Sequence, residues 1–203
     1  MNTSTTFNYN LVGTASAYMI DGLSGDDTLT GGISIDTFNV DAGSDTITDL
    51  GNGADILIVS SGAAANATLK AAWISNTVSS NLGTASINAN GFAVNVSTLN
   101  SGSASGWTLT NSNSTGVISS TGIVMTGSAQ NDTIEGGSGN DTMDGKGGSD
   151  MLDLSGATVT AGTGITFSLV TSAAATPVSF TGIGSDTYAN MEGVIGTSGN
   201  DTF

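Results

Sequence analysis

The sequence predicts an all-β protein made of parallel β-roll (β-solenoid) blocks that are interrupted by additional short β-strands. Three observations predict this fold. An aspartate recurs every nine residues, at Asp27, Asp36 and Asp45, and again further downstream. A large apolar residue lies two positions after each of these aspartates, and glycines are concentrated in the residues before each aspartate. A short, fixed period is typical of solenoids, in which each unit adds to a regular stack.

A second run has the same period and contains the clearest repeat unit. It places Asp132, Asp141 and Asp150 nine residues apart, and residues 136–144 have the sequence GGSGNDTMD. This unit follows the pattern G-G-x-G-x-D-x-U-x, where U is large and apolar. The U positions of the two runs are Leu29, Phe38, Ile47, Ile134, Met143 and Leu152. Because side chains alternate along a strand, we expect these six to point into a core.

The repeats divide the chain into four segments. We expect a first β-roll block at 1–60, a β-rich spacer at 61–126, a second block at 127–153, and a β-rich segment at 154–203 that returns to the repeats. Within the spacer, Val94 and Val96 alternate with polar residues, which indicates short strands. Ala63 to Trp73 is the one stretch in which a helix is an alternative, because Ala, Leu and Lys are good helix formers.

The composition excludes several classes of function. The chain has 203 residues and a net charge of −15, from 17 acidic residues against two lysines. With no arginine, it is unsuited to nucleic acid, whose phosphates need Lys or Arg. Without Cys or His there are no disulfides, no zinc site of the Cys/His kind and no Ser-His-Asp catalysis. No apolar run is long enough for membrane insertion. We therefore predict a protein that is not an enzyme and whose partner is a cation.

The repeat unit suits one cation in particular. Glycines let the chain turn sharply and aim carbonyl oxygens inward, and calcium takes six to eight oxygen ligands at about 2.3–2.6 Å. One loop cannot supply so many, so two loops must share each ion. If two units form one coil, loops on the same edge come from alternate units. The predicted pairs are then Asp27 with Asp45, Asp36 with Asp55, and Asp132 with Asp150, whereas Asp141 has no assigned partner.

The candidate metal-binding residues are these aspartates and the glycines of their loops. They are Gly22, Gly25, Asp27, Gly31, Gly32, Asp36, Gly43, Asp45, Asp55, Gly127, Asp132, Gly136, Gly137, Gly139, Asp141, Gly145, Gly148, Asp150, Gly184, Asp186, Gly199 and Asp201. Asp49, Asp144 and Asp153 fall outside the ligand position, and we expect them to be solvated. The only glutamates, Glu135 and Glu192, carry no positional signal.

These units resemble the RTX, or hemolysin-type, calcium-binding repeat family. The resemblance implies a right-handed parallel β-roll with Ca²⁺ in its loops. It also implies type I export, folding on extracellular calcium, and an extracellular or cell-surface location. The N-terminus has no secretory signal peptide, which agrees with such export. Tyr18 in place of an aspartate, and Val40-Asp41 in place of a glycine pair, depart from the pattern and make calcium weaker there.

We therefore expect a secreted calcium-binding structural protein that self-associates into a polymer or lattice, such as a surface layer, filament or matrix. Few charges and abundant Ser, Thr, Asn, Gly and Ala favour this role. The alternative is a calcium-folded export or stability module of a larger secreted toxin or hydrolase. The chain stops at Asp201-Thr202-Phe203, inside a repeat, so we expect it to be part of a longer protein.

Overall fold

The computed structural model describes residues 8–10, 15–112, 120–159, 163–169 and 178–203. These residues form strands, turns and loops, with no helix among them. The strands are β1 (Asn8–Asn10), β2 (Met19–Asp21), β3 (Thr28–Thr30), β4 (Thr37–Val40), β5 (Ser44–Leu50), β6 (Ile56–Val59), β7 (Ala64–Leu69), β8 (Trp73–Ile74), β9 (Ser80–Asn81), β10 (Thr84–Asn88), β11 (Val94–Asn95), β12 (Trp107–Thr110), β13 (Val124–Thr126), β14 (Thr133–Glu135), β15 (Thr142–Asp144), β16 (Met151–Asp153), β17 (Val178–Phe180), β18 (Gly184–Ala189) and β19 (Gly193–Ile195).

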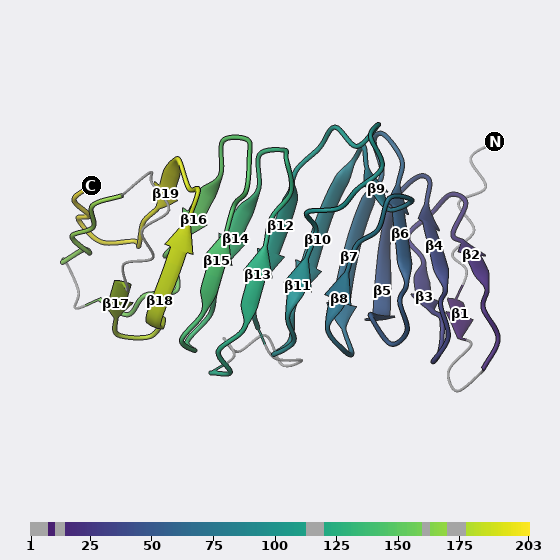
Figure 1. The fold of residues 1–203 in the computed structure, drawn as a ribbon, viewed down its shortest axis with the longest axis horizontal. Coiled ribbons are helices and arrows are strands. Elements are labelled where there is room, and N and C mark those ends of the chain that lie inside the picture. Colours follow the sequence, from purple (N-terminus) through teal and green to yellow (C-terminus); the bar gives the residue numbers. More distant parts are fainter. Residues whose placement is uncertain (1–7, 11–14, 113–119, 160–162, 170–177) are drawn as a thin grey trace.

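The strands form a parallel β-solenoid, as predicted. One sheet has the order β1-β3-β5-β7-β10-β12-β14-β16-β19 and extends from the N-terminal to the C-terminal end of the stack (Figure 1). The other faces are formed by β2-β4-β6-β9 and by β8-β11-β13-β15-β18-β17. The named strands pair in parallel, except for β17, which is antiparallel to β18. The strands between the two repeat blocks therefore continue the same solenoid.

Coil length differs between the repeat blocks and the middle of the chain. Leu29 pairs with Ile47, and Ile134 pairs with Leu152, so two nine-residue units make one coil. In the middle, β7, β8 and β9 belong to three different sheets before the chain returns to the long sheet at β10. These wider coils have three sides, whereas the repeat coils have two.

The core is a set of stacked rows between the sheets. All six apolar positions predicted to point inward are at most 1% exposed. Trp73 and Trp107 fill the wider middle, with ring centroids 6.1 Å apart. Burying large apolar side chains in this way is the main driving force for folding.

The helix considered for Ala63 to Trp73 is wrong, because this stretch forms β7 and β8. Ala65 and Ala67 are buried, while Asn66 between them is exposed. This is the alternation of a strand, and β7 is paired on both sides, by β5 and β10. Pairing with two neighbours outweighs the modest helix propensity of alanine.

Candidate metal centre

The motif aspartates form hydrogen-bonded ladders along the edges of the solenoid. In each step, a backbone N–H donates to the carboxylate of the aspartate one coil further on. The N–H of Asp27 donates to Oδ1 of Asp45 at 3.0 Å, and that of Asp36 donates to Oδ1 of Asp55 at 2.9 Å. These steps join the two pairs that the sequence predicts in the first block.

The second block has the same arrangement. The N–H of Asp132 donates to Oδ1 of Asp150 at 2.7 Å, as the predicted pairing requires. The N–H of Asp141 donates to Oδ1 of Asp186 at 2.8 Å. Asp186 is therefore the neighbour that the sequence left unassigned, although it lies 45 residues away.

The second carboxylate oxygen of these aspartates is the unusual feature. The Oδ2 atoms of Asp36, Asp45, Asp141 and Asp150 are buried and have no hydrogen-bond partner. A buried polar atom without a partner costs about 1–3 kcal/mol, and more when it is charged. Such atoms are uncommon in folded proteins, so a set of four in equivalent positions fits carboxylates that could bind a cation.

The electrostatics of the aspartates support the same conclusion. Burial raises the pKa of Asp55, Asp141 and Asp150 to about 6, and that of Asp186 to about 7. Nearby carboxylates raise the pKa values of Asp55, Asp150 and Asp186 further, as Asp141 does for Asp186. The ionised form is therefore poorly stabilised by the protein alone, and a bound cation would stabilise it.

The first glycine of each unit keeps the space around the carboxylate open. A Cβ on Gly127 would lie 2.6 Å from Oδ2 of Asp132, and one on Gly136 would lie 2.6 Å from Oδ2 of Asp141. Other units have the same close approach, which involves Gly31 with Asp36, Gly145 with Asp150, and Gly22 with Asp45.

The glycine two residues before the aspartate has a different role. Gly43 has a φ of +100°, and a Cβ there would overlap the carbonyl oxygen of Gly25 in the preceding coil. This left-handed conformation is free of strain only for glycine. The same positive φ occurs at Gly25, Gly148 and Gly184. At the second position of the unit it occurs at Gly32 and Gly137, and also at Leu23 and Lys146, where the sequence departs from glycine.

The last predicted unit lies apart from these ladders. Asp201 accepts the N–H of Ile165 at 2.8 Å and the hydroxyl of Thr197 at 2.9 Å. Gly199 packs against the backbone of Thr163, and Gly139 in the second block packs similarly against Thr121. The structure therefore places the loop of Asp201 against residues 163–165.

The expectation that Asp49 is solvated is wrong. It is 6% exposed, and its carboxylate accepts the N–H groups of Gly31 and Gly32 at 3.0 and 2.9 Å. A register shift in β5 between Ile47 and Leu50 places it there. The carboxylate of Asp49 thus binds the first two N–H groups of the loop that ends at Asp36. In the sequence, Asp55 lies ten rather than nine residues after Asp45, which marks a slip in the period here.

Neutral groups replace the carboxylates in the middle coils. The sequence has no acidic residue between Asp55 and Asp132. The N–H of Leu57 donates to the hydroxyl of Ser79 at 3.4 Å, and that of Asn81 donates to the hydroxyl of Ser103 at 3.0 Å. The ladder therefore continues without charge where the repeat pattern is lost.

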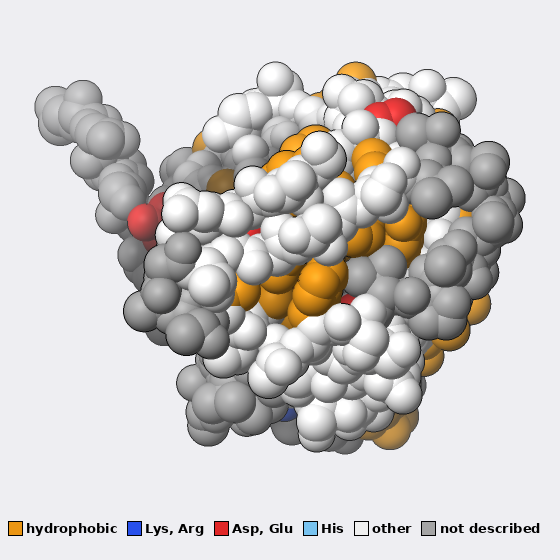
Figure 2. Space-filling model, turned by 90° about the vertical axis from the view of Figure 1, so that its left-hand side faces the viewer, with side chains coloured by type: hydrophobic (Ala, Val, Ile, Leu, Met, Phe, Trp, Pro, Cys, Tyr) orange, Lys and Arg blue, Asp and Glu red, His pale blue; other side chains and the backbone are white. Residues whose placement is uncertain are grey.

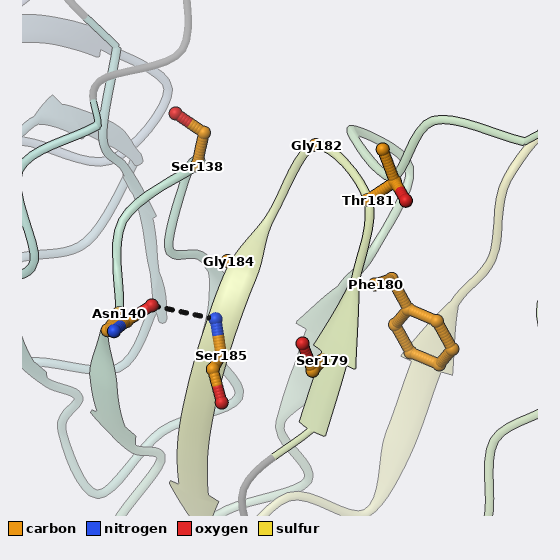
Figure 3. Close-up of a pocket in the computed structure, with 8 residues that line it drawn as sticks. All are labelled: Ser138, Asn140, Ser179, Phe180, Thr181, Gly182, Gly184 and Ser185. Atoms are coloured by element: carbon orange, nitrogen blue, oxygen red, sulfur yellow. Dashed lines mark hydrogen bonds between the residues drawn. The ribbon is translucent and has the colours of Figure 1, made fainter.

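A cleft of about 590 Å³ lies between the loop before β15 and the β17–β18 hairpin (Figure 3). It is lined by Ser138, Asn140, Ser179, Phe180, Thr181, Gly182, Gly184 and Ser185. The side-chain oxygen of Asn140 accepts the N–H of Ser185 at 3.0 Å across one wall. These lining residues have no ionisable side chain, so the cleft itself supplies no general acid or base.

Among the described residues, no three acidic side chains converge as a metal cluster, and no helix is long and apolar enough to cross a membrane. Residues 19–48 and 124–152 match the model of the RTX calcium-binding nonapeptide repeat, in four copies. Comparisons with curated proteins and with solved structures found no match. These two segments are thus similar to RTX nonapeptide repeats, a family described as calcium-binding.

Proposed function

We propose that this RTX-repeat chain is a secreted structural protein whose repeat blocks fold on extracellular calcium and which then self-associates into a polymer or lattice. The observation that carries the proposal is the set of buried Oδ2 atoms without partners in both repeat blocks. In this role calcium is structural, and the chain is not catalytic.

The charge distribution supports folding on calcium. Of the two lysines, Lys146 is engaged, since its ammonium lies 2.8 Å from Oδ2 of Asp144. Hydrogen bonds from Lys146 and Asn190 outweigh the effect of burial and lower the pKa of Asp144. Burial instead raises the pKa of the ladder aspartates Asp55, Asp141, Asp150 and Asp186, and a metal ion would provide the positive charge that they lack. Without the metal, the clustered carboxylates repel one another. When the metal binds, its binding free energy adds to the free energy of folding.

The donors present fit calcium. Each site would take one carboxylate from each of two neighbouring loops, and the rest of its oxygens from backbone carbonyls. In the first block, the carboxylate pairs would be Asp27 with Asp45 and Asp36 with Asp55. In the second block, they would be Asp132 with Asp150 and Asp141 with Asp186. The glycines of these loops would hold the backbone where its carbonyls can reach the ion. Hard oxygen ligands of this kind favour calcium over zinc.

The end of the solenoid supports self-association. Among the described residues, β19 is the last strand of the long sheet and pairs with β16. Figure 2 shows that hydrophobic side chains gather in the middle of the C-terminal end, inside a frame of polar groups and backbone. Phe203 is 63% exposed and Ile195 is 38% exposed. An open strand edge next to apolar surface is suited to pairing with another chain.

The alternative is a calcium-folded module that stabilises or helps to export a larger toxin or hydrolase. RTX repeats support this alternative equally well, because they report the metal and the fold rather than the activity. The two proposals differ in assembly, since a module would stay monomeric when it is folded.

A calcium titration of the purified chain tests both. Far-UV circular dichroism should show β-structure appearing with calcium, and magnesium serves as the control because it demands near-octahedral geometry. Light scattering and electron microscopy on the same samples should then show ordered filaments or sheets. A folded monomer would favour the module, and identical spectra with calcium and with chelator would refute folding on calcium.

A further inference from the structure

The acidic ladder continues one step beyond the matched repeats, at a glutamate. Val194 pairs with Leu152 in the long sheet, so it occupies the apolar position of the next coil. Glu192 precedes Val194 by two residues, which is the spacing of aspartate in the repeats. Glu192 also lies nine residues before Asp201, so it restores the period that appears broken after Asp186.

The hydrogen bonding of Glu192 matches that of the ladder aspartates. The N–H of Asp150 donates to Oε2 of Glu192 at 2.8 Å, just as the N–H of Asp132 donates to Oδ1 of Asp150 at 2.7 Å. The N–H groups of Glu192 and Gly193 both donate to the carbonyl oxygen of Asp150 at 2.9 Å. The backbone of this turn is therefore fixed against the loop that ends at Asp150.

Oxygens from the two coils converge beside Gly145. Asp150 is 0% exposed, and its Oδ2 has no hydrogen-bond partner. A Cβ on Gly145 would meet both this Oδ2 and the carbonyl oxygen of Asn190. Asn190 has a φ of +52°, a left-handed conformation that fixes the direction of its carbonyl. Asp144 holds the ammonium of Lys146 at 2.8 Å, so this nearest lysine is already paired.

We infer that Asp150 and Glu192, with the carbonyl of Asn190, form a further calcium site between the loop 145–150 and the turn 190–192. This inference rests on the proposed function, since it places one more ion of the same kind. Glutamate is longer than aspartate by one methylene, and its carboxylate still accepts the N–H of Asp150 at 2.8 Å. Two carboxylates and carbonyl oxygens are the donor set that calcium takes.

The test compares the two glutamates of the chain. Glu192→Gln removes the charge but keeps an oxygen that can accept the N–H of Asp150. Glu135→Gln is the matched control, because it makes the same change of charge at a half-buried position on β14. Native mass spectrometry counts the bound calcium ions, and competition with a chelator measures affinity. We expect Glu192→Gln to lose one ion, or to bind one ion at least about tenfold more weakly, with Glu135→Gln unchanged.

The outcomes separate this inference from the proposed function. If wild-type protein binds no calcium, the proposed function is wrong. If wild type binds calcium and Glu192→Gln matches Glu135→Gln in both count and affinity, Glu192 only caps the turn and the inference is wrong. If Glu192→Gln does not fold in calcium, Glu192→Asp carries the test. It keeps the carboxylate but shortens its reach, so it should change the affinity of one ion, and an unchanged count and affinity of all ions would overturn the inference.

Discussion

The stability of the repeat blocks should depend on pH with opposite signs in the presence and absence of calcium. Without metal, burial raises the pKa of Asp141 from 3.8 to about 6 and that of Asp186 from 3.8 to about 7. The folded state then binds protons more tightly than the unfolded state, so stability is highest below about pH 4 and is lost as pH rises through 6 to 7. Each carboxyl costs about 3–4 kcal/mol at neutral pH, because one pKa unit corresponds to about 1.4 kcal/mol.

Calcium reverses this dependence. Metal binding requires ionised carboxylates, so protons compete with calcium and stability in calcium falls as pH falls. Far-UV circular dichroism and urea denaturation at about pH 5 and about pH 7.5 measure how stability changes with pH, with and without calcium, in the range where these groups titrate. Metal-free protein should gain β-structure at the lower pH, and calcium-loaded protein should lose stability there. Light scattering checks that aggregation near the pI of about 4.1 does not cause the change.

A substitution isolates the cause. Asp186→Asn imitates the protonated acid, and it should stabilise the metal-free protein at about pH 7.5 by up to about 4 kcal/mol while weakening calcium binding. Asp41→Asn makes the same change of charge at an exposed residue and should do neither. Equal effects of the two substitutions, or the same direction of pH dependence with and without calcium, would show that the ladder aspartates do not control folding.

Two further predictions concern the loops and the middle coils. Gly136→Ala should weaken calcium binding about tenfold or more, since the new Cβ would lie 2.6 Å from Oδ2 of Asp141. Gly147→Ala is the control, because its Cβ would come no closer than 3.9 Å to Ala129. Equal calcium titrations for the two variants would contradict the role of the first glycine. In chelator, the far-UV circular dichroism signal should decrease, but the fluorescence of Trp73 and Trp107 should stay that of buried tryptophan. The reason is that the middle coils, which bury both tryptophans, contain no acidic residue and should stay folded. Loss of both signals together would show that the solenoid unfolds as one unit.

The sequence predicted the features that repeat and missed those that do not. Asp27 and Asp45 are neighbours because two nine-residue units make one coil, and this follows from the period alone. The partner of Asp141 could not be predicted in the same way, because 45 residues separate it from Asp186 and residues 154–180 between them lack the repeat. Hydrogen bonds between coils, rather than distance along the chain, determine that pairing.

The middle coils show a second limit. Serine hydroxyls at Ser79 and Ser103 take the place of aspartates in the ladder. A serine in a Ser-rich segment gives no sign of this role, since many serines there face solvent. Glu192 could have been found, because it stands two residues before an apolar position and nine before Asp201. The repeat pattern has aspartate at this position, so a glutamate there does not match it.

The division between charged and neutral ladders explains how calcium can act on part of the fold. A neutral ladder is satisfied by its own hydrogen bonds, and the middle coils also bury the two tryptophans, so we expect their stability not to depend on a metal. The flanking blocks bury carboxylates whose second oxygen has no partner, so they gain the most when an ion arrives. Both kinds of coil share the nine-stranded sheet. The middle coils therefore provide β7 and β12, to which the flanking strands β5 and β14 can add. Adding strands to an existing edge avoids the cost of starting a new sheet, and long-range pairing is otherwise slow. Under the proposed function, calcium would need to complete only the coils on either side of this middle part.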